Sequence, residues 1–559
     1  MTLSEKTAEL IKARESLTAL RTTQKFQADL IDRGKIKLPI FLRPCRMKIL
    51  MVCDRLGSVL ISYGLTYFGL STLVDTLEND PDFWVEYELT KAHRQTDHLG
   101  AADIDNFRFD DPAFDINEYD QVWFFSTGTS TSGPGALDEN ELEILSRWMD
   151  EKKGGVFATG DHATLGAALC SEIPRVRNMR KWTNSQGVPS NVGPDRHDTL
   201  LKGHNNVYTF DDESDDIPMK TRLRRYPLWS YLIFLARWRP HPVLCGRDGP
   251  IDILPDHPHE GEVIVPTDTS LDFSFNGYTA PEYPGGTNKP KPEIIAWARV
   301  QGDHTSTSDT NKGPANGKEF GAVGAYDGHP VDVGRVVVDS TWHHWMDVNL
   351  VGRPGVPASN PKSEGFEATP AGVQALNRIK NYFLNVAQWL GAPAKQRCMF
   401  NRATWGIVVR YPLAEQLSPK LPIWVLGGFA KDAIGRRASQ CTMYQWIKPV
   451  LPEWVNRFEF QTDWLEKIGP RLAAPDYETF ETIVLGGVTR SMLEIAYEFD
   501  DEKGEISEKL VAEAMANGLA QGVREYQGLL EESRKEATAL EDGIDKDAYS
   551  KISARDFLG

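Results

Sequence analysis

Between residues 47 and 161, short apolar segments alternate with amphipathic ones, and this alternation restricts the fold more than any other feature of the sequence. The first segment, "MKILMVCD" (Met47 to Asp54), is a continuous apolar run typical of a strand buried on both faces of a parallel sheet. Strand-like patterns follow over residues 83–92, 119–128 and 154–161, and helical patterns over 65–79 and 137–154. This βαββαβ order predicts a doubly wound, mainly parallel α/β sheet with helices on both faces.

The alternation is lost from about residue 171 to 290, in a stretch rich in Pro, Gly and Asp, and then resumes. Strands are predicted for residues 292–300, 320–327 and 333–345, and a helix over 372–390 closes the region.

The chain has 559 residues, more than one hydrophobic core usually supports. We expect one α/β domain over residues 46–392, with a flavodoxin-like sheet and a large insertion. A helical arm is predicted before it, over residues 1–45. Residues 393–559 carry helical patterns without catalytic spacing, which predicts a mainly helical C-terminal domain that forms homo-oligomers.

The formal net charge of −17 disfavours nonspecific nucleic-acid binding, which needs concentrated Lys and Arg. No apolar run approaches the roughly 18 residues of a membrane span, and the N-terminus lacks the apolar core of a signal peptide. Six cysteines without CxxC spacing predict reduced, mostly buried thiols. We therefore expect a cytoplasmic protein whose partner is a small polar ligand. The cysteines are Cys45, Cys53, Cys170, Cys245, Cys398 and Cys441.

Polar residues follow two of the predicted strands, where open α/β sheets bind their ligands. The Ser/Thr/Gly loop after one of them suits hydrogen bonds to an anion or to sugar hydroxyls, and we predict that both groups of residues bind the substrate. A plain flexible loop is the alternative for the second group. The residues are Asp54 and Arg55 after the first strand, and Ser126, Thr127, Gly128 and Thr129 after the third.

Two further strand ends carry histidines. "ATGDHATLG" has the shape of a nucleophile elbow, a sharp turn that presents one side chain above the sheet, and it holds Asp161 and His162. "VVVDSTWHHW" ends in His343 and His344. Imidazoles serve as metal ligands or acid/base groups, so all four residues are predicted to be catalytic. Of the adjacent histidines, one should face inward and the other pack against a neighbouring tryptophan, because successive strand residues point to opposite faces.

The segment "LPDHPHEGEV" concentrates histidines and carboxylates within the insertion. In an extended backbone, which Pro258 favours, His257 and His259 share a face and form a His-x-His pair. With Asp256 they predict a divalent metal site for zinc or manganese, and Glu260 is a candidate general base. A polar lid loop without a metal is the alternative. No nucleotide-cofactor motif is present.

The order "MKILMVCD", "YDQVWFFSTG", "GGVFATGDHATLG", "PEIIAWARV" and "VGRVVVDSTWHHW" resembles the ThuA-like (trehalose-utilisation) branch of the class I glutamine-amidotransferase-like superfamily. In that branch a strand flanked by two glycines leads into a histidine-bearing turn, and a late "GRV" strand ends in histidine. The resemblance covers residues 46–392 and implies that the insertion can cover the strand ends. Glutamine amidotransferases have a cysteine at the elbow, where this chain has His162. The resemblance therefore implies no glutaminase activity.

Together these features predict a hydrolase of a polar, carbohydrate-like or nucleotide-like small molecule, with water activated by a divalent metal or by a His/Asp pair. The histidines at residues 162, 343 or 344, and 257 or 259 are expected to converge in one pocket. The second hypothesis is an inactive ligand-sensing or assembly protein, which the missing elbow cysteine favours. The third is a cysteine amidase that uses Cys170 or Cys53.

Overall fold

The computed structural model describes most of the α/β region and the main helices of the C-terminal region. The predicted N-terminal arm and much of the insertion lie outside the described residues. Those described are 44–56, 59–66, 68–80, 84–133, 135–160, 164–183, 219–228, 237–246, 249–255, 262–286, 289–300, 318–352, 365–410, 421–435, 440–447, 477–498 and 508–543.

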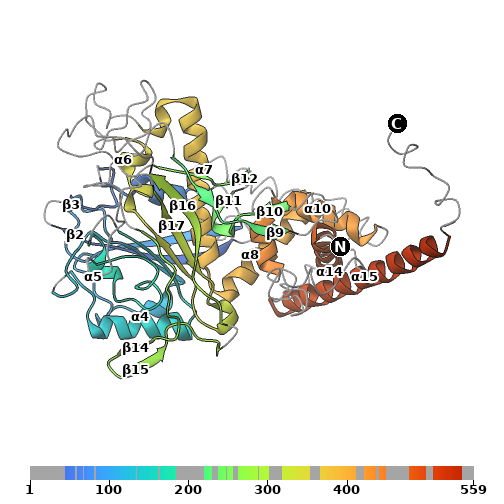
Figure 1. Ribbon diagram of the computed structural model, residues 1–559, viewed down its shortest axis with the longest axis horizontal. Coiled ribbons are helices and arrows are strands. Elements are labelled where there is room, and N and C mark those ends of the chain that lie inside the picture. The colour runs from blue at the N-terminus through green and yellow to red at the C-terminus, as the bar shows by residue number, and fades with distance from the viewer. Residues whose placement is uncertain are drawn as a thin grey trace, which may run out of the picture.

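An eight-stranded sheet forms the centre of the α/β region (Figure 1). Its first five strands pair in parallel, and the remaining pairings are antiparallel. The mixed α/β fold with a mostly parallel sheet is therefore confirmed. In sheet order the strands are β4 (Val85–His93), β1 (Cys45–Cys53), β5 (Gln121–Phe125), β6 (Gly155–Thr159), β18 (Val336–Asp339), β17 (Lys318–Tyr326), β16 (Glu293–Val300) and β8 (Arg222–Leu223).

Strand β1 supplies side chains to two separate hydrophobic cores. Ile49 and Met51 belong to the core that includes α3 (Ser71–Glu78) and α7 (Pro370–Leu390). Leu50 and Val52 belong to the core that includes α4 (Glu139–Glu151). Successive strand residues point to opposite faces, so a continuous apolar run requires helices on both faces, as the sequence predicts.

Local sequence signals account for the two long helices of this region. Asp138 and Glu141 form a capping box at the start of α4. The Thr369 hydroxyl accepts the Gly372 N–H at the start of α7, where Pro370 occupies the first turn. Helix α7 begins two residues before its predicted range and ends where predicted, and both ends of α4 lie within three residues of its predicted range.

The antiparallel half of the sheet departs from the predicted rhythm. Strands β16 and β17 pair antiparallel, as do β17 and β18. Antiparallel neighbours need no crossover helix, and the sequence between β16 and β17 carries no helical pattern. The described part of the insertion adds the edge strand β8 and several short two-stranded pairings. These are β7 (Met219–Lys220) with β13 (Ile253–Leu254), β9 (Tyr226–Leu228) with β10 (Arg237–Arg239), β11 (Cys245–Gly246) with β12 (Gly249–Pro250), and β14 (Asp272–Phe275) with β15 (Tyr278–Pro281).

The C-terminal region is helical in its described part and extends to one side of the α/β region (Figure 1). Its apolar residues continue the core that contains α7. Helices α14 and α15 approach closely at Gly487 and Gly518, where a Cβ on either residue would overlap the backbone of the other helix. None of the described helices is long and apolar enough to cross a membrane. The helices are α8 (Pro393–Arg410), α10 (Ile423–Gly435), α11 (Gln440–Ile447), α14 (Tyr477–Glu498) and α15 (Glu508–Gly543).

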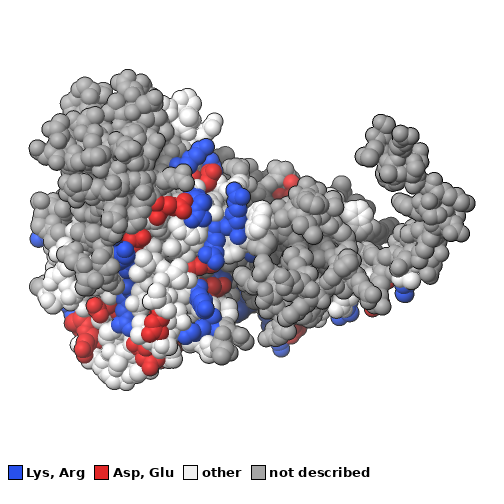
Figure 2. Space-filling view, viewed as in Figure 1, with Lys and Arg blue, Asp and Glu red and all other residues white. Residues whose placement is uncertain are grey.

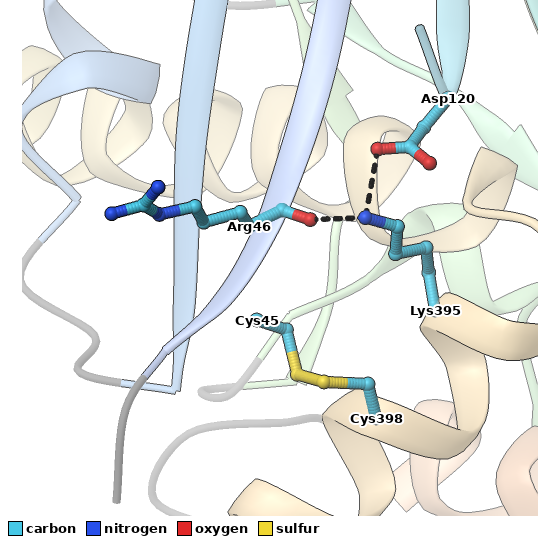
Figure 3. The surroundings of a disulfide bond; sticks show 5 residues. All are labelled: Cys45, Arg46, Asp120, Lys395 and Cys398. Atoms are coloured by element: carbon cyan, nitrogen blue, oxygen red, sulfur yellow. Dashed lines mark hydrogen bonds and ion pairs between the residues drawn. A yellow bond between two sulfur atoms is a disulfide. The ribbon is translucent and has the colours of Figure 1, made fainter. Parts of the chain in front are cut away.

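A disulfide joins Cys45, at the start of β1, to Cys398 on α8 (Figure 3). Beside it, the Lys395 ammonium donates to the Arg46 carbonyl at 2.6 Å and lies 3.1 Å from the Asp120 carboxylate. The prediction of reduced thiols is wrong for this pair. The two cysteines are 353 residues apart in sequence, and only the docking of α8 against β1 brings them together. The other four cysteines are buried thiols outside any disulfide, as predicted.

The helical region attaches at the amino ends of the parallel strands. Besides the disulfide, Trp84, which precedes β4, meets Trp446 of α11 edge to face at 5.2 Å. Trp446 in turn donates to the Gln396 side chain of α8 at 3.0 Å. The carboxyl ends of the same strands, where the sequence predicts the site, lie at the opposite end of the sheet along the strand direction. The helical region is therefore anchored away from the edge where the sequence predicts a site.

Candidate functional site

The register of the sheet brings the carboxyl ends of four parallel strands to one level. Cys53 of β1 pairs with Phe125 of β5, and Phe125 pairs with Thr159 of β6. Because Val338 of β18 pairs with Ala158, Asp339 lies level with Thr159. The residues that follow these strands form the edge at which the candidate site is built.

Asp339, the last residue of β18, is a fully buried carboxylate with donors on both oxygens. Oδ1 accepts from the His344 ring at 2.7 Å and from the Thr341 N–H at 3.2 Å. Oδ2 accepts from the Tyr382 hydroxyl at 2.8 Å and from the Trp345 indole at 3.0 Å. A buried carboxylate is costly unless it is hydrogen-bonded, and these four donors satisfy that requirement. Burial and the neighbouring Asp339 raise the pKa of Tyr382, so Tyr382 remains a donor.

The His344 imidazole is oriented by Asp339. A carboxylate oxygen only accepts, so the proton of the neutral ring is on Nδ1 and Nε2 carries a lone pair. Nε2 makes no hydrogen bond to any residue that the structure describes, and the side chain is 2% exposed. Asp339 and His344 therefore form an oriented carboxylate–imidazole pair, the arrangement that general bases use.

His343 is held differently, although it is the next residue. Its Nδ1 lies 2.7 Å from the side-chain oxygen of Asn349, and its ring meets Trp342 edge to face at 5.7 Å. The predicted contact of one histidine with a neighbouring tryptophan is confirmed. Its stated reason is wrong, because both histidines lie on the 3-10 turn η8 (Trp342–His344) and not on a strand, and both are buried.

A second cluster joins the ends of β1 and β5 around Asp54. The Asp54 carboxylate is fully buried and accepts from the Ser126 hydroxyl at 2.7 Å. It also accepts from the N–H of Thr127 at 2.5 Å and from that of Gly128 at 3.1 Å. Burial raises the pKa of Asp54, and these hydrogen bonds oppose the rise. Four of the predicted substrate-binding residues therefore bind one another.

The other two predicted substrate-binding residues stay outside this cluster. The Arg55 side chain is exposed, and its backbone N–H donates to the Gln95 side chain at 3.2 Å. Thr129 is partly buried in the loop that follows β5. Their side chains remain candidates for ligand contact.

The loops after β5, β6 and β18 are joined by backbone hydrogen bonds. The Ser126 N–H donates to the Thr159 carbonyl at 3.2 Å, and the Trp342 N–H donates to the Gly160 carbonyl at 2.9 Å. Thr159 and Gly160 thus connect the Asp54 cluster to the Asp339–His344 pair. The predicted elbow begins at this position.

Several predicted site residues lie outside the described part of the chain. Among the described residues, no group of three or more His, Cys, Asp or Glu side chains is placed to hold a metal ion. The predicted metal site and the convergence of three histidines are therefore untested. The predicted residues outside the description are Asp161, His162, Asp256, His257, His259 and Glu260.

The two cysteines of the amidase hypothesis are unsuited to nucleophilic attack. Cys53 and Cys170 are fully buried, and burial raises the pKa of both thiols well above the ordinary value. Because the thiolate is the nucleophile, a raised pKa lowers reactivity at neutral pH.

Tyr382 and Trp345 are site residues that the sequence reasoning missed. Trp345 is the last residue of the "TWHHW" motif, in which only the histidines were predicted to be site residues. Tyr382 lies on α7, and nothing in its surrounding pattern separates it from a core aromatic residue. No sequence signal indicates its contact with Asp339.

Comparison with known proteins adds no relative: no family model, curated protein or solved structure matches this chain.

Proposed function

We propose that the protein is a hydrolase in which the Asp339–His344 pair activates water at the carboxyl ends of the strands. The observation that carries the proposal is the 2.7 Å contact between His344 Nδ1 and Asp339 Oδ1. It fixes the tautomer and directs the basic nitrogen away from the carboxylate.

The chemistry needs only proton transfers at His344. Nε2 removes a proton from water while the oxygen attacks the electrophilic carbon or phosphorus of the substrate. Asp339 stabilises the imidazolium that results. Nε2–H then protonates the leaving group as its bond breaks, which returns the ring to its neutral form.

The proposed substrate is a small polar molecule, carbohydrate-like or nucleotide-like. Arg55 and Thr129 support this proposal, because their side chains are not used by the Asp54 cluster. A zinc or manganese ion at Asp256, His257 and His259, with Glu260 as a base, belongs to the same proposal. Asp161 and His162 would take part in activating the water.

We also propose that the fold is flavodoxin-like and related to the ThuA-like branch. The five parallel strands support this, since their order β4-β1-β5-β6-β18 corresponds to 2-1-3-4-5 by first appearance in the chain. In that order the strand connections change direction between β1 and β5, where Asp54 and the loop after Phe125 meet.

The test uses 4-nitrophenyl acetate, 4-nitrophenyl glucosides and bis(4-nitrophenyl) phosphate with the full-length protein. For any probe that is hydrolysed, His344→Asn should lower kcat/KM by about 10²–10⁴, the usual contribution of a general base. The matched control, His343→Asn, should lower it less than about tenfold by the same argument. In each variant the Asn amide can donate in place of the histidine Nδ1, and the nitrogen Nε2 is lost. The two substitutions should therefore affect folding to a similar degree. Full activity in folded His344→Asn would overturn the proposal.

The second candidate is an inactive ligand-sensing or assembly protein. It is favoured by the near-complete burial of His344 and by the attachment of the helical region at the other edge of the sheet. Here the helices would mediate homo-oligomers. Hydrolysis of none of the three probes, together with a thermal shift on adding a monosaccharide or nucleoside, would favour this candidate.

The cytoplasmic location also remains a proposal. The Cys45–Cys398 disulfide argues against the cytoplasm and favours an oxidising compartment, where such bonds persist. Alkylation of the protein in intact cells, followed by mass mapping of Cys45 and Cys398, distinguishes the two environments.

A further inference from the structure

Two cysteine pairs lie where the helical region meets the α/β region. The first is the Cys45–Cys398 disulfide between β1 and α8. The second consists of Cys245 on β11 and Cys441 on α11, both buried and neither in a disulfide. Each pair has one cysteine on a strand and one on a helix of the C-terminal region.

The two cysteines of the second pair lie close together. The Cys441 thiol lies close enough to Cys245 and to the Arg239 guanidinium for both to influence its pKa. Helix α11 also packs against β11. Asn385 of α7 fixes the strand residue, because its amide donates to the Cys245 carbonyl at 3.1 Å. The packing of α11 on β11 thus holds the two buried cysteines close to each other.

We propose that Cys245 and Cys441 are a second disulfide-forming pair, which low-molecular-weight disulfides oxidise and which then links the helical region covalently to the α/β region. The inference rests on the packing of α11 against β11, which buries the two cysteines close together, and is independent of the proposed hydrolase. Its ligand class is a small dialkyl disulfide such as glutathione disulfide.

The reaction proceeds by two thiol–disulfide exchanges. The Cys245 thiolate, on the more exposed of the two residues at 8% against 2%, attacks the small disulfide and expels one thiolate. The Cys441 thiolate then attacks the Cys245 sulfur of the mixed disulfide and expels the second. The two cysteine protons pass to the two leaving thiolates. One disulfide and two protein thiols thus become one protein disulfide and two small thiols.

Reactivity in this pair should depend on pH. Burial and the neighbouring Cys245 raise the pKa of Cys441, and the Arg239 guanidinium opposes the rise. Because the thiolate is the reacting form, oxidation should accelerate as the pH is raised towards that pKa. Arg239→Gln should slow it at any fixed pH below that value.

The experiment treats the full-length native protein with excess glutathione disulfide at neutral and mildly alkaline pH. The protein is then unfolded in iodoacetamide, digested and mapped by mass spectrometry. We expect a linked Cys245–Cys441 peptide that is lighter than the two thiol peptides by two hydrogens. Cys53 and Cys170 should be recovered alkylated, and Cys45–Cys398 should remain linked.

Two variants make the outcome decisive. Cys245→Ser should abolish the linked peptide, whereas Cys170→Ser, the matched loss of a buried thiol elsewhere, should retain it. Oxidised wild type should also unfold at a higher temperature than protein with the pair reduced, because the new bond restricts the unfolded chain. Recovery of Cys245 and Cys441 only as separate alkylated or glutathionylated peptides at the end of the reaction would overturn the proposal.

Discussion

Two buried aspartates follow parallel strands of the same sheet, and their surroundings differ in one decisive way. Asp54, after β1, accepts from backbone N–H groups and from hydroxyls of the loop after β5. Asp339, at the end of β18, accepts from an imidazole, an indole, a phenol and one backbone N–H. Both carboxylates are fully buried, but only that of Asp339 accepts a hydrogen bond from an imidazole ring.

The two clusters also lie on different faces of the sheet. Residue alternation places Asp54 on the face of Leu50 and Val52, towards the core of α4. Asp339 shares the face of Val337, and it contacts Tyr382 of α7. The comparison teaches that a buried carboxylate at a strand end can hold a neighbouring loop or orient an imidazole ring, and that the partners of the carboxylate decide which.

A histidine accompanies each cluster, and the two rings have opposite hydrogen-bonding roles. His93, at the end of β4, accepts the Gln95 N–H on Nδ1 at 2.9 Å, so its proton is on Nε2. His344 has its proton on Nδ1 and its lone pair on Nε2. A neutral ring fixed like His93 is structural, whereas one fixed like His344 can act as a base.

The largest expected effect is that of Asp339→Ala. This variant leaves four buried donors without their acceptor, so it should lower the free energy of unfolding by roughly 3–5 kcal/mol. Urea denaturation of the full-length protein measures the change. Glu118→Ala is the control, because Glu118 is 66% exposed although it lies 3.5 Å from Lys48. Its effect should be below about 1 kcal/mol.

A smaller loss is expected for Asp54→Ala, about 2–4 kcal/mol in the same denaturation experiment. Two of its donors are hydroxyls, which can rotate towards other acceptors, and Gly128 is only partly buried. If this variant loses as much stability as Asp339→Ala, the hydrogen bonds to Asp54 are no easier to replace than those to Asp339, and the proposed difference between the two clusters is wrong.

The smallest effect concerns the pH dependence contributed by His93. Burial lowers the pKa of the ring from its ordinary value of 6.5, while Asp97, Asp54 and other acids oppose the shift. Below about pH 6.5 the unfolded chain binds a proton that the folded ring does not, so stability falls as pH falls towards the lowered pKa. The slope attributable to this ring is at most about 1.4 kcal/mol per pH unit.

His93→Asn tests this contribution, because the Asn oxygen can accept the Gln95 N–H without titrating. Denaturation midpoints are measured between about pH 7.5 and 4.5, at intervals of about half a pH unit. As the pH is lowered, the midpoint should fall less steeply for the variant than for wild type. Parallel curves would show that His93 does not titrate differently in the folded and unfolded protein.

The sequence predicted more of the fold than of the site. Continuous apolar runs located β1, β5, β6 and β18, because a strand buried on both faces must be apolar throughout. The capping box at Asp138 and the Thr-Pro start of α7 set helix boundaries in the same local way. The sequence did not indicate the antiparallel pairing of β16 and β17, since parallel and antiparallel strands have similar residue patterns.

Within the site, the sequence identified candidate residues but not their partners. His343 and His344 are equivalent in the motif, and only the 3-10 turn directs one to Asn349 and the other to Asp339. The residues Ser126 to Gly128 were predicted to contact a substrate, yet their donors are directed at Asp54.

The sequence by itself determined the layered α/β architecture, its helical C-terminal region and the strand ends at which polar residues gather. These follow from periodicity and from capping residues, which act over a few positions along the chain. Only the tertiary structure decided that Tyr382 and Trp345 hold Asp339, that Cys45 bonds to Cys398, and that Cys245 meets Cys441. Each of these contacts joins side chains that lie on separate structural elements and meet only when those elements pack, and periodicity along the chain carries no record of that packing.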